Sequence, residues 1–182
     1  MVRDDHAPSL SSLLSITKAQ ARERRWACVF AYMERETMKI RLEPVTVASR
    51  AAVERLETAP GQEGFVESVA ECLAEADRRR CWRPVGVYDG DALIGFAMYG
   101  FFWEYLPFGR LWLGRRFQGR GYGRAALAAL LERLEREYHK KRIYLSVVEA
   151  NRPAAALYES FGFRFTGERD THGERVMCLR TR

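Results

Sequence analysis

Gln118-Gly-Arg-Gly-Tyr-Gly-Arg124 places three glycines at alternate positions, directly before a segment with a regular apolar stripe. In that segment, 124–138, apolar residues recur at intervals of three and four, which predicts an amphipathic helix: Leu127, Leu130, Leu131, Leu134 and Tyr138. A glycine turn that opens a helix can direct several backbone N–H groups and the positive helix N-terminus at one anion. Glycine also lets the anion approach closely, because it has no Cβ. The turn therefore predicts a phosphate-binding site.

The charge around this turn supports that prediction. Between residues 110 and 142 there are ten basic and three acidic residues, a local charge of +7. The whole chain of 182 residues carries +6, and 26 of its 30 basic residues are Arg, whose planar guanidinium suits phosphate. An Arg-rich coding bias would also explain the overall excess, so the local concentration is the stronger observation.

Two other phosphate loops do not fit the turn. A P-loop needs G-x-x-x-x-G-K-[ST]. Gly114 and Gly119 have the spacing of its two glycines, but Arg120 and Gly121 stand where the Lys and the Ser or Thr are needed. A dinucleotide-binding turn needs G-x-G-x-x-G, whereas the spacing here is G-x-G-x-G, and no clear carboxylate follows the next strand to hold a ribose. Nucleotide hydrolysis and a Rossmann site are therefore not expected.

The flanking sequence predicts a mixed sheet around the turn. Strands are expected at 39–45, 84–88, 92–99, 110–113, 143–148, 163–166 and 176–179, and further helices at 48–57, 63–77 and 153–160. Antiparallel strands followed by strand, glycine turn, helix and parallel strand predict an α+β or mixed α/β fold with one right-handed crossover. We expect residues 1–37 to be an N-terminal extension, helical or poorly ordered, and 38–182 to be the folded domain.

The glycine turn and the segments that follow it resemble a known family. Gln118-x-x-Gly121-x-Gly123 opens a helix, a strand ends near Asn151, and Leu157-Tyr158 leads into Phe161-Gly162-Phe163. This ordered set resembles the GCN5-related N-acetyltransferases (GNAT) over roughly 92–179. Within them it is most similar to the bacterial spermine/spermidine (diamine) acetyltransferases, through 62–65, 84–100, 117–123, 166–168 and 173–174. The resemblance implies a GNAT-like, mostly antiparallel sheet flanked by helices.

The resemblance also implies a binding site for acetyl-CoA. The backbone of the turn would hold the pyrophosphate, through Gln118, Gly119, Arg120, Gly121, Tyr122, Gly123 and Arg124. Leu111 and Leu113, on the preceding strand, would pair with the pantetheine arm, and Asn151 would hydrogen-bond to it. From the residues alone, Asn151 is equally well placed to cap a helix ahead of Pro153, and the two roles are compatible.

Tyr158 stands where the family has its general acid, seven residues after Asn151. A phenol with a pKa near 10 can protonate the thiolate that leaves when an acetyl group moves from sulfur to nitrogen. The alternative is a core tyrosine packed beside Phe161 and Phe163. A base must also deprotonate the acceptor amine; Glu104 and Glu149 are candidates by position, but the sequence selects neither over a surface role. Gly114 departs from relatives that have a polar or acidic residue after the strand, which leaves the substrate geometry open.

The acceptor is predicted to be a small-molecule amine. Seven acidic residues and two arginines lie between 49 and 77, a local charge of −5, and Glu67, Glu71 and Glu75 are the candidate carboxylates for binding a polyamine. An ordinary solvated helix face is the alternative. Acetylation of another amine (a protein N-terminus, an aminoglycoside or an amino-acid analogue) and a catalytically silent acyl-CoA-binding module also remain open.

The remaining features exclude other classes of protein. Four cysteines without a C-x-x-C pair, and no His at ligand spacing, indicate neither a metal site nor a disulfide framework. The longest apolar run is far too short to span a membrane, and no recognition helix for nucleic acid is evident. We therefore expect a cytoplasmic enzyme without a nucleic-acid or membrane partner. A homodimer is possible, because the aromatic segment 101–105 suits either an interface or the acceptor pocket.

Overall fold

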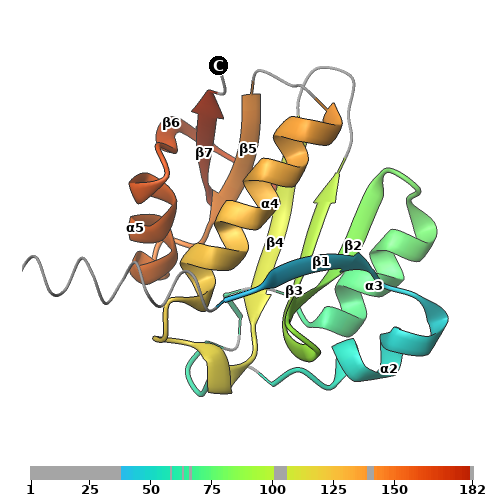
Figure 1. The fold of residues 1–182 in the computed structure, drawn as a ribbon. Coiled ribbons are helices and arrows are strands. Elements are labelled where there is room, and N and C mark those ends of the chain that lie inside the picture. Colours follow the sequence, from blue (N-terminus) through green and yellow to red (C-terminus); the bar gives the residue numbers. More distant parts are fainter. Residues whose placement is uncertain are drawn as a thin grey trace, which may run out of the picture. The chain divides into compact units, whose positions relative to one another are not determined.

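The computed structural model describes residues 38–57, 59–62, 64–65, 67–100, 106–138 and 142–180 (Figure 1). The predicted N-terminal extension, 1–37, and the aromatic segment 101–105, which includes Glu104, lie outside these residues. The described strands form one sheet in the order β1-β2-β3-β4-β5-β7-β6. Their bounds are β1 Ile40–Pro44, β2 Trp82–Asp89, β3 Ala92–Gly100, β4 Leu106–Leu113, β5 Arg142–Val147, β6 Arg164–Arg169 and β7 Arg175–Arg180.

Helices cover both faces of the sheet. Their bounds are α2 Val47–Glu54, α3 Val69–Arg78, α4 Tyr122–Tyr138 and α5 Arg152–Ser160, and a short 3-10 helix covers Arg115–Phe117. On one face, Ala126, Leu127, Leu130 and Leu134 of α4 and Tyr158 of α5 belong to the larger apolar core. On the other face, α2 and α3 pack against Phe96, Met98 and Trp112 in a second core. No helix in the described ranges is long and apolar enough to cross a membrane.

The predicted fold class is confirmed. All neighbouring strand pairs in the described sheet are antiparallel except β4 and β5, which are parallel and are joined through the glycine turn and α4. Figure 1 shows α4 lying along the sheet between the two strands that it connects. The crossover thus carries the chain from the end of β4 through the predicted anion site and back to the start of β5.

The start of α3 differs from the sequence expectation. A helix is expected over 63–77, but α3 begins at Val69 because Ser68 caps it. The Ser68 hydroxyl accepts a hydrogen bond from the Glu71 backbone N–H (3.3 Å), and the Glu71 carboxylate accepts one from the Ser68 N–H (2.9 Å). Gly64 has a φ of +91°, which a helix does not allow. Phe65 therefore lies in a loop, not on the apolar stripe of the helix.

The parallel pair β4 and β5 separates after its first two residues. Within the described sheet these strands pair at Leu106 with Ile143 and at Pro107 with Tyr144, whereas β4 continues to Leu113 and β5 to Val147. The register between β3 and β4 shifts between Met98 and Tyr99, next to this point, and such a bulge bends a strand. The separation places an opening in the sheet at the end of β4, where the glycine turn begins.

Candidate functional site

Two cavities meet at the opening between β4 and β5. The first, of about 250 Å³, extends from the glycine turn along the end of β4 to the start of α5. The second, of about 350 Å³, lies between the start of α3, β4, the end of β5 and the turn between β6 and β7. Residues common to both linings are Phe65, Leu111, Asn151, Ala154 and Tyr158. A ligand in one cavity can therefore reach a ligand in the other beside Tyr158.

The glycine turn is held to the end of β4 by Gln118. Its amide Nε2 donates hydrogen bonds to the Leu113 carbonyl (3.0 Å) and to Gln62 Oε1 (2.9 Å). The backbone then turns through Gly119 and Gly121, whose φ angles of 70° and 85° favour glycine, and α4 begins at Tyr122. The Arg124 and Ala125 N–H groups donate to the Gly121 carbonyl (3.0 and 3.2 Å), so an anion at this end would be bound by the N–H groups that precede them.

Three polar side chains of the turn contact other side chains. The Tyr122 hydroxyl donates to Asp89 Oδ2 (2.9 Å), and the Arg124 guanidinium donates to Ser160 Oγ (3.0 Å) and lies over the Phe161 ring. Arg120 lies over the ring of Tyr122. None of these three side chains is among the residues that line the first cavity, whereas Gln118, Gly119 and Gly123 of the turn are.

Six of the ten residues predicted to bind acetyl-CoA line the first cavity: Leu111, Leu113, Gln118, Gly119, Gly123 and Asn151. The other four, Arg120, Gly121, Tyr122 and Arg124, lie on the turn or in the first turn of α4 but not among the lining residues. A Cβ on Gly123 would stand 3.4 Å from Leu113 Cδ1 and 3.5 Å from Leu157 Cδ2, so it would project into the space between β4 and α5. Glycine at this position keeps that space free of a further side chain, which fits a ligand bound close to the backbone.

The position of Asn151 is compatible with both roles considered from the sequence, the cap of a helix and a contact with the cofactor. Its Oδ1 accepts a hydrogen bond from the Ala154 N–H (3.3 Å), which caps α5, and Pro153 stands in the first turn. It also lines both cavities. The cap fixes the side chain at the point where the two cavities join.

Tyr158 is buried on α5, with its ring packed edge-on against Phe163 at a centroid distance of 5.8 Å. The packing expected of a core tyrosine is thus present, and the side chain also lines both cavities. Burial raises the pKa of Tyr158 to about 12, because the phenolate is poorly solvated there. The hydroxyl is therefore protonated at neutral pH. Tyr158 can give up a proton but cannot take one until it has done so.

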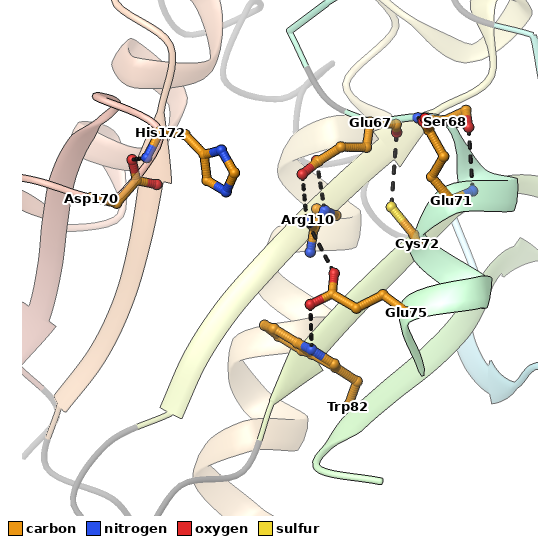
Figure 2. Close-up of polar contacts among 9 residues, drawn as sticks. All are labelled: Glu67, Ser68, Glu71, Cys72, Glu75, Trp82, Arg110, Asp170 and His172. Carbon is orange, nitrogen blue, oxygen red and sulfur yellow. Dashed lines mark hydrogen bonds and ion pairs between the residues drawn. The ribbon is translucent and has the colours of Figure 1, made fainter. Parts of the chain in front are cut away.

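An ion-paired network forms one wall of the second cavity (Figure 2). Arg110 of β4 donates from Nε and from a terminal nitrogen to the two carboxylate oxygens of Glu67 (2.8 and 2.6 Å). The same terminal nitrogen lies 3.4 Å from the Glu75 carboxylate, which also accepts a hydrogen bond from Trp82 Nε1 (3.0 Å). Arg110 holds the pKa of Glu67 at about 2, so this carboxylate stays charged.

The three predicted acceptor-site carboxylates differ in their placement. Glu67 and Glu75 line the second cavity, where Arg110 pairs with both. Glu71 is not among the lining residues; its carboxylate accepts hydrogen bonds from Ser68, which lower its pKa. The structure thus assigns Glu71 to the capping of α3.

Of the two predicted base candidates, only Glu149 lies in the described part of the chain, and it does not line the second cavity. Glu149 is exposed, forms an ion pair with Arg169 (3.2 Å) and lines a separate cavity of about 310 Å³ beside α5. Glu104 lies outside the described residues.

Several lining residues of the second cavity were not identified from the sequence as site residues. They are Phe65, Arg79, Trp82, Arg110 and, on the turn between β6 and β7, Asp170, Thr171, His172 and Glu174. Thr171-His172-Gly173 is typical of a turn and His172 is exposed there, but its place in the same cavity as Glu75 of α3 depends on the strand order of the whole sheet. A turn signal alone does not give that neighbour.

Comparison with known proteins places the chain in one family. Residues 49–163 match the acetyltransferase (GNAT) family. A spermine/spermidine N(1)-acetyltransferase of Bacillus subtilis strain 168 is 44% identical over 148 residues, which cover 77% of this chain and 97% of that protein.

Solved structures share the fold at lower identity. The spermidine N-acetyltransferase of Vibrio cholerae, crystallised with CoA and spermine, has a TM-score of 0.64 at 19% identity over 78% of this chain and 95% of that one. The PaiA N-acetyltransferase of Thermoplasma acidophilum, in complex with coenzyme A, has a TM-score of 0.61 at 16% identity over 79% and 100%. The family predicted from the glycine turn and the Asn151 and Tyr158 segment is confirmed. The chain belongs to the GNAT family of acetyltransferases.

Proposed function

We propose that this enzyme transfers the acetyl group of acetyl-CoA to a primary amine of a polyamine such as spermidine or spermine. The observation that carries the proposal is the meeting of the two cavities at Tyr158, one walled by the glycine turn and the other by carboxylates. The 44% identity to a spermine/spermidine acetyltransferase, over nearly the whole of that protein, supports the choice of acceptor.

Acetyl-CoA brings the reactive acetyl group, bound to sulfur as a thioester. In the proposal the backbone from Gln118 to Arg124 binds its pyrophosphate, since a helix N-terminus after two glycines with positive φ favours an anion. The edge of β4 at Leu111 and Leu113, unpaired with β5 at this level, binds the pantetheine arm. Asn151 hydrogen-bonds to the same arm where the two cavities join.

Tyr158 is proposed as the general acid. When the C–S bond of the thioester breaks, the sulfur leaves as a thiolate that needs a proton. The phenol is protonated at neutral pH because burial raises its pKa to about 12, and Tyr158 lines both cavities. Its ring packs edge-on against Phe163, which helps to hold the phenol beside both cavities.

The second cavity suits a cationic acceptor. Its lining contains four carboxylates, Glu67, Glu75, Asp170 and Glu174, and two guanidinium groups, Arg79 and Arg110. The excess of negative charge attracts an amine with several ammonium groups and raises its rate of encounter. Arg110 neutralises much of the charge of Glu67 and Glu75, which leaves the turn between β6 and β7 as the more strongly negative wall.

We also propose a cellular location and an oligomeric state for the enzyme. We place it in the cytoplasm, in agreement with the free thiols of Cys72, Cys81 and Cys178 among the described residues. A homodimer is proposed as its state in solution, and sedimentation velocity would test it.

The test is acetyl-CoA-dependent thiol release with spermidine as acceptor, beside a blank without amine. The expected result is release that depends on spermidine and a product acetylated on a primary amine by mass spectrometry. Release with other amines but not with polyamines would show that the acceptor is a different class of amine. Binding of acetyl-CoA without release for any amine would identify a silent acyl-CoA-binding module.

A further inference from the structure

The proposed function leaves one chemical task without a residue. An aliphatic ammonium with a pKa near 10 is almost fully protonated at neutral pH and cannot attack a thioester until it loses a proton. We infer that His172, on the turn between β6 and β7, is the general base that takes this proton from the acceptor. The inference rests on the proposed function and adds a catalytic residue to it.

The fold holds His172 at the acceptor cavity. The residue lines the second cavity together with Tyr158, and Figure 2 shows its ring on the side of the turn that faces Glu67 and Arg110. Asp170 fixes the turn: its Oδ1 accepts hydrogen bonds from the backbone N–H groups of His172 and Glu174 (both 2.9 Å), and its carbonyl accepts one from Gly173 (3.0 Å). The imidazole therefore extends from a turn that is held by three hydrogen bonds to Asp170.

Four other titratable groups of this cavity are less suited to the task. Tyr158 is protonated, and Arg110 holds the pKa of Glu67 at about 2, which makes that carboxylate a very weak base. Glu75 is occupied by Arg110 and Trp82, and Asp170 by the backbone of its own turn. An imidazole is the side chain that exchanges a proton most readily near neutral pH, and general-base catalysis is most efficient there. The titratable and charged residues that line the cavity together with His172 are Glu67, Glu75, Asp170, Glu174, Arg79, Arg110 and Tyr158.

The proton balance of the transfer is then complete. One proton of the acceptor ammonium passes to the imidazole and from there to solvent. The freed nitrogen lone pair forms the bond to the acetyl carbon, the C–S bond breaks, and the nitrogen loses a second proton as the amide forms. The sulfur gains one proton from Tyr158. The second proton lost by the nitrogen then restores the Tyr158 hydroxyl. The net change is one proton released to solvent for each acetyl group transferred.

The test compares His172→Gln with the wild-type enzyme from pH 6.5 to 9, using spermidine and saturating acetyl-CoA. At pH 7 we expect kcat/KM to fall about 100-fold in the variant. The loss should shrink about ten-fold for each unit of pH, because the variant depends on amine that is already deprotonated in solution. Glu168→Gln is the matched control: Glu168 is exposed on the same hairpin and outside the cavity lining, and its kinetics should equal wild type.

Glu174→Gln separates the loss of a base from the loss of cavity charge. Removal of this carboxylate should raise KM for spermidine by a similar factor at every pH, whereas removal of the base should lower kcat/KM in a pH-dependent way. A His172→Gln variant with wild-type activity at pH 7, or with a loss that is constant from pH 6.5 to 9, would overturn the assignment. Wild-type inactivity towards every polyamine would instead overturn the proposed acceptor, and the same pH comparison would then be made with the amine that is accepted.

Discussion

Arg110 grips both carboxylate oxygens of Glu67, at 2.8 Å and 2.6 Å, and so ties the loop before α3 to the middle of β4. The Arg110 side chain is 15% exposed, and that of Glu67 is 46% exposed. The pair is therefore buried on the side of the guanidinium and open to solvent on the side of the carboxylate. Two parallel hydrogen bonds with this geometry are stronger than an ordinary surface ion pair.

This pair predicts an acid-dependent part of the stability. The pKa of Glu67 lies at about 2 in the folded protein, against 4.5 for an unperturbed glutamate, so its contribution is complete above about pH 4.5 and is lost as the pH falls towards 2. We expect Glu67→Gln to be less stable than wild type by about 1 kcal/mol at pH 7, because half of the carboxylate is screened by solvent. Urea unfolding at pH 7 and pH 3 measures the difference, which should be smaller at pH 3. An equal difference at both values would contradict the assigned pKa.

Glu71 and Glu75 provide a matched pair of substitutions on one helix. Glu75→Gln removes a charge from the acceptor cavity, so we expect KM for spermidine to rise several-fold with little change in KM for acetyl-CoA. Glu71→Gln should leave both constants unchanged and lower the free energy of unfolding slightly, because it removes a negative charge from the first turn of α3. Steady-state kinetics and urea unfolding of both variants make the test. Equal effects of the two on KM for spermidine would show that only the overall charge of the helix matters.

Gly123→Ala separates ligand binding from the stability of the fold. The added Cβ would make ordinary contacts of 3.4 and 3.5 Å with Leu113 and Leu157, and alanine favours a helix over glycine by about 0.5–1 kcal/mol. We therefore expect an unchanged or higher melting temperature. KM for acetyl-CoA should rise about ten-fold, since the methyl group projects into the first cavity. Tight binding of CoA to the variant, measured by calorimetry, would be incompatible with a ligand lying against this backbone.

Tyr158→Phe keeps the packing against Phe163 and removes only the hydroxyl. Loss of a general acid is expected to lower kcat by about 10²–10⁴-fold, with CoA affinity nearly unchanged. Tyr88→Phe, on β2 and absent from the lining of both cavities, is the control for the loss of a phenol elsewhere. If kcat stays within a factor of two of wild type, Tyr158 is a core residue and another group protonates the thiolate.

The sequence predicts the parts of the site that depend on local structure. The glycine turn, the helix after it and the cap at Asn151 are set by residues within a few positions of one another, and all are present. The contacts of Arg110 with Glu67 and Glu75 join residues 43 and 35 positions apart, and no periodicity encodes them. His172 reaches the cavity only because β7 pairs with β5 rather than with β4, which depends on the order of the sheet.

The start of α3 shows the same limit on a smaller scale. Periodic apolar residues from Phe65 onwards favour a longer helix, but Gly64 and the Ser68 cap override them. Because α3 begins only at Val69, Phe65 lies outside the helix and lines both cavities. A capping box of the form S-x-x-E was the available signal in the sequence, at Ser68 and Glu71.

The short ladder between β4 and β5 gives the sheet two edges in its interior. Peptide groups on such edges lack the protection from solvent exchange that a paired strand provides, and an extended ligand with amide groups can add to them as a strand would. Bound acetyl-CoA would then act as a removable eighth strand for the described sheet. Hydrogen exchange at the end of β4 should slow when CoA is added, and the cofactor would join mechanically the two halves of the sheet that carry the two walls of the acceptor cavity.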